Sequence, residues 1–298
     1  MTLSRLVGLE LNVLQKELKE KQKAVLKYNK ILSNKNEMKK EIIKELLSLK
    51  EKYGASRKTE IVDAVPVEIK EKEEEEIPVV VLVDKFYYVH CVDASVYKKS
   101  ADTINSDYRY IIYTTNKGKV SIFCNSGKAH IVKVQDIPYG KIKDKGQPLD
   151  NICNYNSKVE NVVGITNIAD NKYIFISSDG FIKVVNMSEF NVIRKSIDAT
   201  KLKDGSSLVS VLPYIETGQI VLSTKKGIYI RFKQNEIPLQ KKNAVGATGI
   251  KLADGDSIVM ASVVEDMSTE IPFGSNKIEA EKIKITRRGG KGVKPRIS

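Results

Sequence analysis

Apolar residues recur with helical spacing through the first 53 positions of the chain. One stripe runs through Leu6, Leu14, Leu18, Val25 and Leu32, and a second through Met38, Ile42, Leu46, Leu49 and Tyr53. A period near 3.6 predicts two long amphipathic helices. The polar segment 33–37 favours a helix N-cap at Ser33 or Asn34, so the helices are expected to fold back as an antiparallel hairpin. Further apolar residues widen this surface, which should therefore pack against another chain or domain.

Residues 61–76 lose this periodicity. They include Pro66 and end in a run of Glu around a single Lys. Like charges repel and keep a segment extended and solvated, so these residues predict a linker. The sequence thus assigns residues 1–60 to the helical hairpin, or coiled coil, and residues 61–76 to an acidic linker.

Residues 77–298 alternate between apolar and polar side chains with a period of two. Four segments have the pattern of strand, tight turn and strand, and their turns place Tyr87, Gly127, Gly180 and Gly227 in matching positions, 40, 53 and 47 residues apart. Such periods, built from antiparallel strands, are typical of bladed propellers. Residues 276–298 fit part of a fifth unit. The predicted fold class is therefore α+β and multidomain, with a helical hairpin before an all-β, propeller-like domain.

The positive charge is concentrated in this second region. Residues 1–76 carry 17 Lys and Arg against 15 Asp and Glu, whereas the remaining residues carry 33 against 22. A basic domain beside a nearly neutral one favours a polyanionic partner, with ordinary solubility as the alternative explanation. The hydrophobic content of 41% and charged content of 29% are typical of a globular protein, neither disordered nor embedded in a membrane.

The chain offers few candidates for metal binding or a disulfide framework. Its three cysteines, Cys91, Cys124 and Cys153, are odd in number and lack CxxC spacing. His90 and His130 lie in predicted strands with no second ligand nearby in sequence, so no metal site is expected. A start without a signal-peptide pattern and the absence of long apolar runs predict a cytoplasmic protein with no membrane partner.

A short segment near the end has the chemistry of a phosphate-binding loop. Arg287, Arg288 and Lys291 supply charge, and Gly289, Gly290 and Gly292 would let backbone N–H groups approach a phosphate. Without base-reading Asn or Gln among them, contact with the nucleic-acid backbone is expected. A solvated terminal tail is the alternative.

Weaker copies of this segment occupy the matching place in other repeats. They are Lys141, Lys143 and Lys145 before Gly146, Arg194 and Lys195 before Ala199, and Lys241 and Lys242 before Gly246. We number the four segments basic loop 1 (141–146), basic loop 2 (194–199), basic loop 3 (241–246) and basic loop 4 (287–292). One basic loop per blade would line the rim of the domain with positive charge, and a duplex following that rim must bend.

Three motifs carry a family resemblance. RRGGKG at 287–292 resembles the gyrase-A box, Q-R-R-G-G-K-G, while LSRLVGLE at 3–10 and EKYGASRKTEI at 51–61 resemble the segments that open and close a coiled coil in the same family. The chain therefore resembles the C-terminal part of a bacterial type IIA topoisomerase A subunit, of the gyrase or topoisomerase IV kind. The resemblance implies a DNA-wrapping β-pinwheel at 77–298 and a dimeric exit-gate coiled coil at 1–60.

The sequence departs from the family pattern at three points. Thr286 replaces the first Gln of the box, the intact box lies in the last repeat, and Tyr87 replaces the turn glycine of the first blade. The first two departures favour a topoisomerase IV-like subunit with eroded boxes. The third predicts a distorted first hairpin.

The resemblance also implies which parts of the reaction lie elsewhere. The family's nucleophile is a Tyr preceded by Arg in an upstream domain, and the Arg109–Tyr110 pair lies in a predicted strand instead. No catalytic residue or cofactor is therefore expected in this chain. ATP, Mg²⁺ and the ATPase B subunit would act on other domains or subunits, with double-stranded DNA as the partner here. The alternative is a protein-interaction scaffold that dimerises through its helical hairpin.

Overall fold

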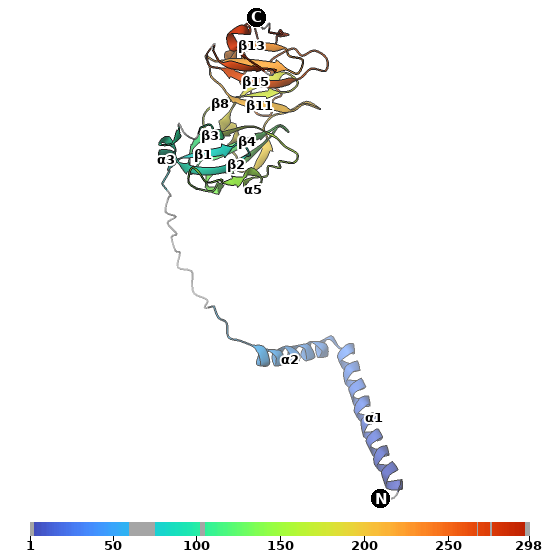
Figure 1. The fold of residues 1–298 in the computed structure, drawn as a ribbon. Helices are drawn as coiled ribbons and strands as arrows, with labels where there is room; N and C mark the ends of the chain where they lie inside the picture. Colours follow the sequence, from blue (N-terminus) through green and yellow to red (C-terminus); the bar gives the residue numbers. More distant parts are fainter. Residues whose placement is uncertain (1–2, 60–74, 102–104, 267, 275, 296–298) are drawn as a thin grey trace. The chain divides into compact units, whose positions relative to one another are not determined.

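The computed structural model describes residues 3–59, 75–101, 105–266, 268–274 and 276–295. The chain divides into two compact units, residues 1–72 and residues 73–298 (Figure 1). Most of the expected linker, 61–76, lies outside the described residues. No helix in the described ranges is long and apolar enough to cross a lipid bilayer.

The first unit contains two helices, α1 (Leu3–Ser33) and α2 (Lys35–Tyr53). Asn34 caps α2 because its side-chain oxygen accepts a hydrogen bond from Asn36 N at 2.9 Å. Gly54 follows the last turn and donates its N–H to Lys50 O at 2.7 Å. The predicted break between the helices and the predicted N-cap are both confirmed.

The apolar stripes of these helices remain open to solvent. Leu14, Leu18 and Leu46 are 64%, 59% and 58% exposed. The ion pair that joins the helices, Lys27 Nζ to Glu41 Oε1 at 3.5 Å, is exposed and contributes about 1 kcal/mol at most. The structure therefore has the two helices but not the expected antiparallel closure, since their stripes are not buried against each other. Two helices alone bury little apolar area, so closure needs a further surface.

The second unit is a series of antiparallel sheets, numbered here as blades 1 to 5. Blade 1 has β1 (Pro78–Asp84), β2 (Tyr88–Asp93), β3 (Tyr108–Thr115) and β6 (Gln147–Pro148). Blade 2 has β4 (Lys119–Cys124), β5 (Lys128–Lys133), β7 (Val162–Asn167) and β10 (Ser196–Asp198). Blade 3 has β8 (Lys172–Ser177), β9 (Phe181–Asn186), β11 (Leu208–Pro213) and β14 (Ala247–Thr248). Blade 4 has β12 (Gln219–Thr224), β13 (Tyr229–Lys233) and β15 (Ile258–Val264), and blade 5 has β16 (Glu270–Phe273) and β17 (Asn276–Glu279).

Short helical turns follow the hairpin of each blade. They are α3 (Ala94–Lys98), η1 (Val134–Asp136), η2 (Met187–Phe190), η3 (Gln234–Glu236) and η4 (Ala280–Lys282), with α5 (Leu149–Ile152) after β6. After η1, η2 and η3 the chain crosses to the preceding blade. There β6, β10 and β14 each add the outermost strand to a sheet, in the orders β3-β1-β2-β6, β10-β5-β4-β7 and β11-β8-β9-β14.

The matching turns identified in the sequence have one backbone geometry. Tyr87, Gly127, Gly180 and Gly227 all have positive φ, between 62° and 89°, and Gly274 supplies the fifth with φ 56°. Tyr87 is the only non-glycine residue with positive φ in the described structure. The turn is therefore preserved in blade 1 with a side chain in a conformation that costs about 1 kcal/mol.

Neighbouring blades enclose a series of apolar clusters. Val81 and Ile122 share one between blades 1 and 2, Phe123 and Phe175 one between blades 2 and 3, and Ile174 and Leu222 one between blades 3 and 4. A fourth cluster lies between blades 4 and 5. The hairpin strands of blades 1 to 4 are thus buried on both faces, and alternate residues along them point to different neighbours.

Candidate nucleic-acid interface

Basic loops 1, 3 and 4 occupy equivalent places: the residue after each, Gln147, Ala247 or Val293, pairs with the residue two after the positive-φ turn. Basic loop 2 was misplaced by the sequence, because Ile197 takes that pairing in blade 2 and Asn191, rather than Arg194, stands where the other loops have Lys141, Lys241 and Arg287. Each loop follows a helical turn and leads the chain to the outer edge of the preceding blade, where β6, β10 and β14 pair with β2, β5 and β9. Basic loop 4 reaches blade 4 in the same way, because Val293 N donates to Tyr229 O at 2.9 Å. The inner strands β3, β7, β11 and β15 lie at the opposite edge of the blades and contact one another in turn. The loops therefore recur along one edge.

The last glycine of three basic loops is required by this crossing. Gly146, Gly246 and Gly292 have φ of 72°, 112° and 68°, and a Cβ on them would lie 2.4, 3.0 and 2.7 Å from a backbone oxygen of the preceding blade. The first glycine of loop 4, Gly289, donates its N–H to Gly249 O at 2.8 Å. These glycines serve blade packing, which differs from the phosphate-cradling role that the sequence suggests for them.

We expect Gly292→Ala to lower the free energy of unfolding by about 2 kcal/mol or more. The added methyl group meets both an unfavourable φ and the carbonyl oxygen of Tyr229. Gly205→Ala is the matched control, because Gly205 has φ 76° with nothing within 4 Å. Denaturant titration of both variants measures the difference; equal losses would contradict a role in blade packing.

The second basic residue of loops 3 and 4 is used inside the fold. Arg288 donates from its backbone N to Glu236 Oε2 at 2.8 Å, and from Nε to Glu236 O and Nη1 to Thr248 O at 2.7 Å each. Lys242 repeats this pattern one blade earlier, with its backbone N 3.0 Å from Glu189 Oε2 and its Nζ 2.8 Å from Glu189 O. These cations hold their loops against the helical turn of the preceding blade, η2 for loop 3 and η3 for loop 4. They are positioning residues for the interface rather than free phosphate ligands.

The remaining cations of the loops point into solvent. Arg287 and Lys291 of loop 4, Lys241 of loop 3, Arg194 and Lys195 of loop 2, and Lys141, Lys143 and Lys145 of loop 1 are all exposed. Among the described residues their side chains form no hydrogen bond or ion pair, and Lys145 Nζ lies 4.7 Å from the Tyr88 ring centroid. The set formed by Lys141, Arg194, Lys241 and Arg287 stands five residues before the last position of each loop, so we call it the leading cations. These groups are available to a polyanion.

Surface grooves connect some of these cations. Arg194 and Asp198 of loop 2 line a groove of about 600 Å³ together with Lys242 and Asn243 of loop 3. A groove of about 870 Å³ beside loop 4 is lined by Lys291 and Lys294 and by Lys226 and Lys251 from blade 4 and the segment after β14. Lys226 and Lys251 were not expected from the sequence. Two consecutive lysines directly before the turn residue Gly227 are the sequence feature that could have identified Lys226.

A buried lysine supports basic loop 3 from within the sheet. Lys183 on β9 is 1% exposed, and its Nζ donates to Lys242 O at 2.5 Å, Ala244 O at 2.7 Å and Lys241 O at 3.4 Å. Burial lowers the pKa of Lys183 to about 8, against the opposing effect of the Glu189 carboxylate. Lys183 therefore fixes the backbone of the loop that presents Lys241.

The position of Lys183 is equivalent in every complete blade. It stands three residues after the positive-φ turn, where the others have His90, His130 and Ile230. His130 Nδ1 lies 2.9 Å from Ser196 Oγ of basic loop 2, and Ile230 lies below Gly290 of basic loop 4. The residue three positions after the turn therefore supports the basic loop that packs on its blade. In the sequence, this position could have been recognised from the polar residues that interrupt otherwise apolar strands.

Tyr110 has a structural role in β3. It is paired with Val83 and packs on the cluster between blades 1 and 2. Burial raises the pKa of its phenol, and the Arg109 guanidinium donates to Tyr87 Oη at 2.8 Å. A buried phenol with a raised pKa is poorly suited to nucleophilic attack, as expected for an ordinary strand residue.

Comparison with known proteins links this geometry to DNA topoisomerases. A model of the family described as DNA gyrase C-terminal domain, beta-propeller, matches residues 171–214, 218–265 and 277–294. The DNA gyrase A subunit of Lawsonia intracellularis is 26% identical over 98% of this chain, and that of Mycoplasma genitalium 25% over 99%. The chain spans 38% and 37% of the length of these two relatives.

A solved structure shares the fold of the second unit. The C-terminal domain of DNA topoisomerase IV superimposes on 74% of this chain, using 72% of its own, with a TM-score of 0.63 and 20% identity. The series of blades with exchanged outer strands is thus the β-pinwheel fold.

Proposed function

We propose that this chain belongs to the A-subunit family of gyrase and topoisomerase IV, whose C-terminal beta-propeller model matches residues 171–214, 218–265 and 277–294, and that it binds and bends double-stranded DNA. In this proposal the second unit is the DNA-wrapping part of an ATP-dependent type II DNA topoisomerase. It assists strand passage by holding a curved duplex along the edge that carries the basic loops.

One observation carries the proposal. The leading cations are exposed and unpaired among the described residues, and three of them, Lys141, Lys241 and Arg287, recur in the same structural place of their repeats. Arg194 lies three positions further along its loop, just before β10. Cations at regular intervals along one edge suit the repeating phosphates of a duplex, whose counterions they displace. Binding of this kind depends on backbone charge and DNA deformability rather than on base sequence.

The intact enzyme would supply the parts that this chain does not carry. We propose that an ATPase B subunit binds ATP, that Mg²⁺ acts in the cleavage domain, and that the cleavage tyrosine lies in that domain. The exposed stripes of α1 and α2 would then close in a homodimeric exit gate. The eroded basic loops favour a topoisomerase IV-like subunit that works on chromosomal DNA in the cytoplasm.

Electrophoretic mobility shift with linear duplex and with minicircles of the same sequence tests this proposal. If about five phosphates are neutralised, log affinity should fall with log salt at a slope near −4.5. Minicircles should bind more tightly, because their bending energy is already supplied. Salt-independent binding, or none to duplex DNA, would contradict the proposal and favour the protein scaffold.

A further inference from the structure

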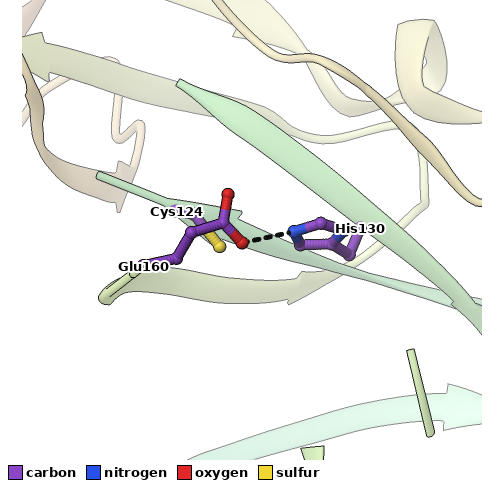
Figure 2. A group of neighbouring side chains, drawn as sticks. All are labelled: Cys124, His130 and Glu160. Atoms are coloured by element: carbon purple, nitrogen blue, oxygen red, sulfur yellow. Dashed lines mark hydrogen bonds and ion pairs between the residues drawn. The ribbon is translucent and has the colours of Figure 1, made fainter. Parts of the chain in front are cut away.

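Three potential metal ligands from separate segments meet inside blade 2. Figure 2 shows Cys124 at the end of β4, His130 on β5 and Glu160 before β7 facing one another. One ligand atom from each, Sγ, an imidazole nitrogen and a carboxylate oxygen, lies within 4.8 Å of the others. All three residues are buried, with exposures of 0%, 3% and 8%. The sequence predicts no metal site here, since 29 residues separate His130 from Glu160.

The donor set matches the preferences of a zinc-type cation. Thiolate, imidazole and carboxylate are the three protein ligand types of Zn²⁺, at about 2.0–2.3 Å from the ion. Ligand atoms around a tetrahedral ion therefore lie roughly 3.3–3.6 Å apart. His130 Nε2 and Glu160 Oε2 are already 3.0 Å apart, so small side-chain rotations bring all three atoms to that spacing.

Hydrogen bonds from a surrounding shell orient two of the ligands. His130 Nδ1 is 2.9 Å from Ser196 Oγ, which leaves Nε2 directed at the cluster. Ser126 Oγ donates to Glu160 Oε1 at 2.8 Å, which leaves Oε2 directed at the same point. Ligating histidines and carboxylates in metal proteins are commonly held by second partners of this kind.

The cluster lies close to the surface. His130 and Ser196 line a surface pocket of about 380 Å³ with Lys128, Asn154 and Asp198. Three protein ligands leave the fourth position of a tetrahedral ion to a water molecule. On binding, the Cys124 thiol proton leaves to solvent, and the neutral His130 ring carries its proton on Nδ1, which donates to Ser196 Oγ.

We propose that Cys124, His130 and Glu160 form a zinc-type divalent-cation site that ties β4, β5 and the segment before β7 together. Through Ser196 the site also holds basic loop 2, in which Ser196 itself stands at the place of the packing glycine of the other loops. In blade 3, the buried Lys183 supports the loop from the position that His130 occupies in blade 2.

Titration of the full chain with Co²⁺ and with Zn²⁺ tests this site. We expect one equivalent of Co²⁺ to bind with visible bands of four-coordinate geometry and a thiolate-to-cobalt charge-transfer band, which one equivalent of Zn²⁺ abolishes. Zn²⁺ should also raise the Tm of the wild-type chain, and a chelator should reverse the rise. Absence of stoichiometric binding to the folded wild-type chain would overturn the proposal, whatever happens to the variants.

The variants identify the ligands. Cys124→Ser should abolish the charge-transfer band, whereas Cys91→Ala, a substitution of another buried thiol, should retain it. Ser196→Ala, which removes the partner of His130 Nδ1 and no ligand, should weaken Co²⁺ binding roughly tenfold. A charge-transfer band that persists in Cys124→Ser would assign the thiolate to another residue and overturn the site. Because the readout uses no DNA, it is independent of the proposed function.

Discussion

Replacing the leading cations Lys141, Arg194, Lys241 and Arg287 together with alanine is expected to lower affinity for duplex DNA roughly a thousandfold in about 0.1 M salt. Each phosphate that is no longer neutralised removes about 0.9 from the slope of log affinity against log salt. The slope should therefore become shallower by about 3.6. Binding titrations of the wild type and the variant over a range of salt concentrations measure both quantities.

A control variant with the same change of net charge shows whether the loss of DNA affinity depends on where the cations lie or only on how many there are. Lys16, Lys23, Lys30 and Lys50 are exposed on α1 and α2, and alanine maintains a helix at each position. Their replacement should leave the DNA slope nearly unchanged. If both quadruple variants lose affinity equally, the basic edge of the blades is not the DNA site.

Lys183→Met should weaken DNA binding about tenfold at pH 7 while leaving the fold as stable as before or more so. The ammonium group makes three hydrogen bonds to basic loop 3, and Met cannot hold the loop backbone in place. Burying the charge costs stability, however, and the apolar side chain removes that cost. A lower affinity for DNA together with an equal or higher Tm would show that Lys183 positions the loop and is not needed for core stability.

The stability cost of Lys183 should depend on pH in a defined window. Its pKa is lowered from 10.5 to about 8 in the fold, so between these values the unfolded chain binds more protons than the folded chain. The free energy of unfolding of the wild type should therefore rise relative to Lys183→Met as pH increases from 8 to 10.5, by about 3 kcal/mol in all. Below pH 8 the full cost is present.

The affinity for DNA should change over the same pH range, but it should fall as the pH increases. As Lys183 loses its proton above pH 8, wild-type affinity should fall towards that of the variant, whose profile over this range should be flatter. The charged groups beside the ammonium are Glu189 and Lys242. Ile230→Met, at the matching position under basic loop 4, is the control and should show neither change. Parallel pH profiles for the wild type and Lys183→Met would contradict the role of Lys183.

The sequence alone determined the two-unit organisation and the repeat of the second unit. Alternation with a period of two and a glycine at each tight turn are short-range signals, because they depend on neighbouring residues only. For the same reason Gly127, Gly180 and Gly227 were correctly aligned, and Asn34 was correctly placed at the start of α2. Basic loops 1, 3 and 4 could also be placed by counting from these turns, whereas the count misplaced basic loop 2 by three residues, because the connection to β10 is shorter than in the other repeats.

Only the tertiary structure decided which cations are exposed and which are hydrogen-bonded inside the fold. Arg287 and Arg288 are adjacent and chemically alike, yet Arg288 is held by Glu236, 52 residues earlier, while Arg287 is exposed. Likewise, Cys124, His130 and Glu160 meet although their spacing matches no metal motif. The metal-ligand cluster forms because β7 pairs with β4 within blade 2, and the Arg288 contacts form because outer strands are exchanged between blades. Both arrangements bring segments that are distant in the sequence into contact, and those long-range contacts leave no local pattern of hydrophobic and polar residues.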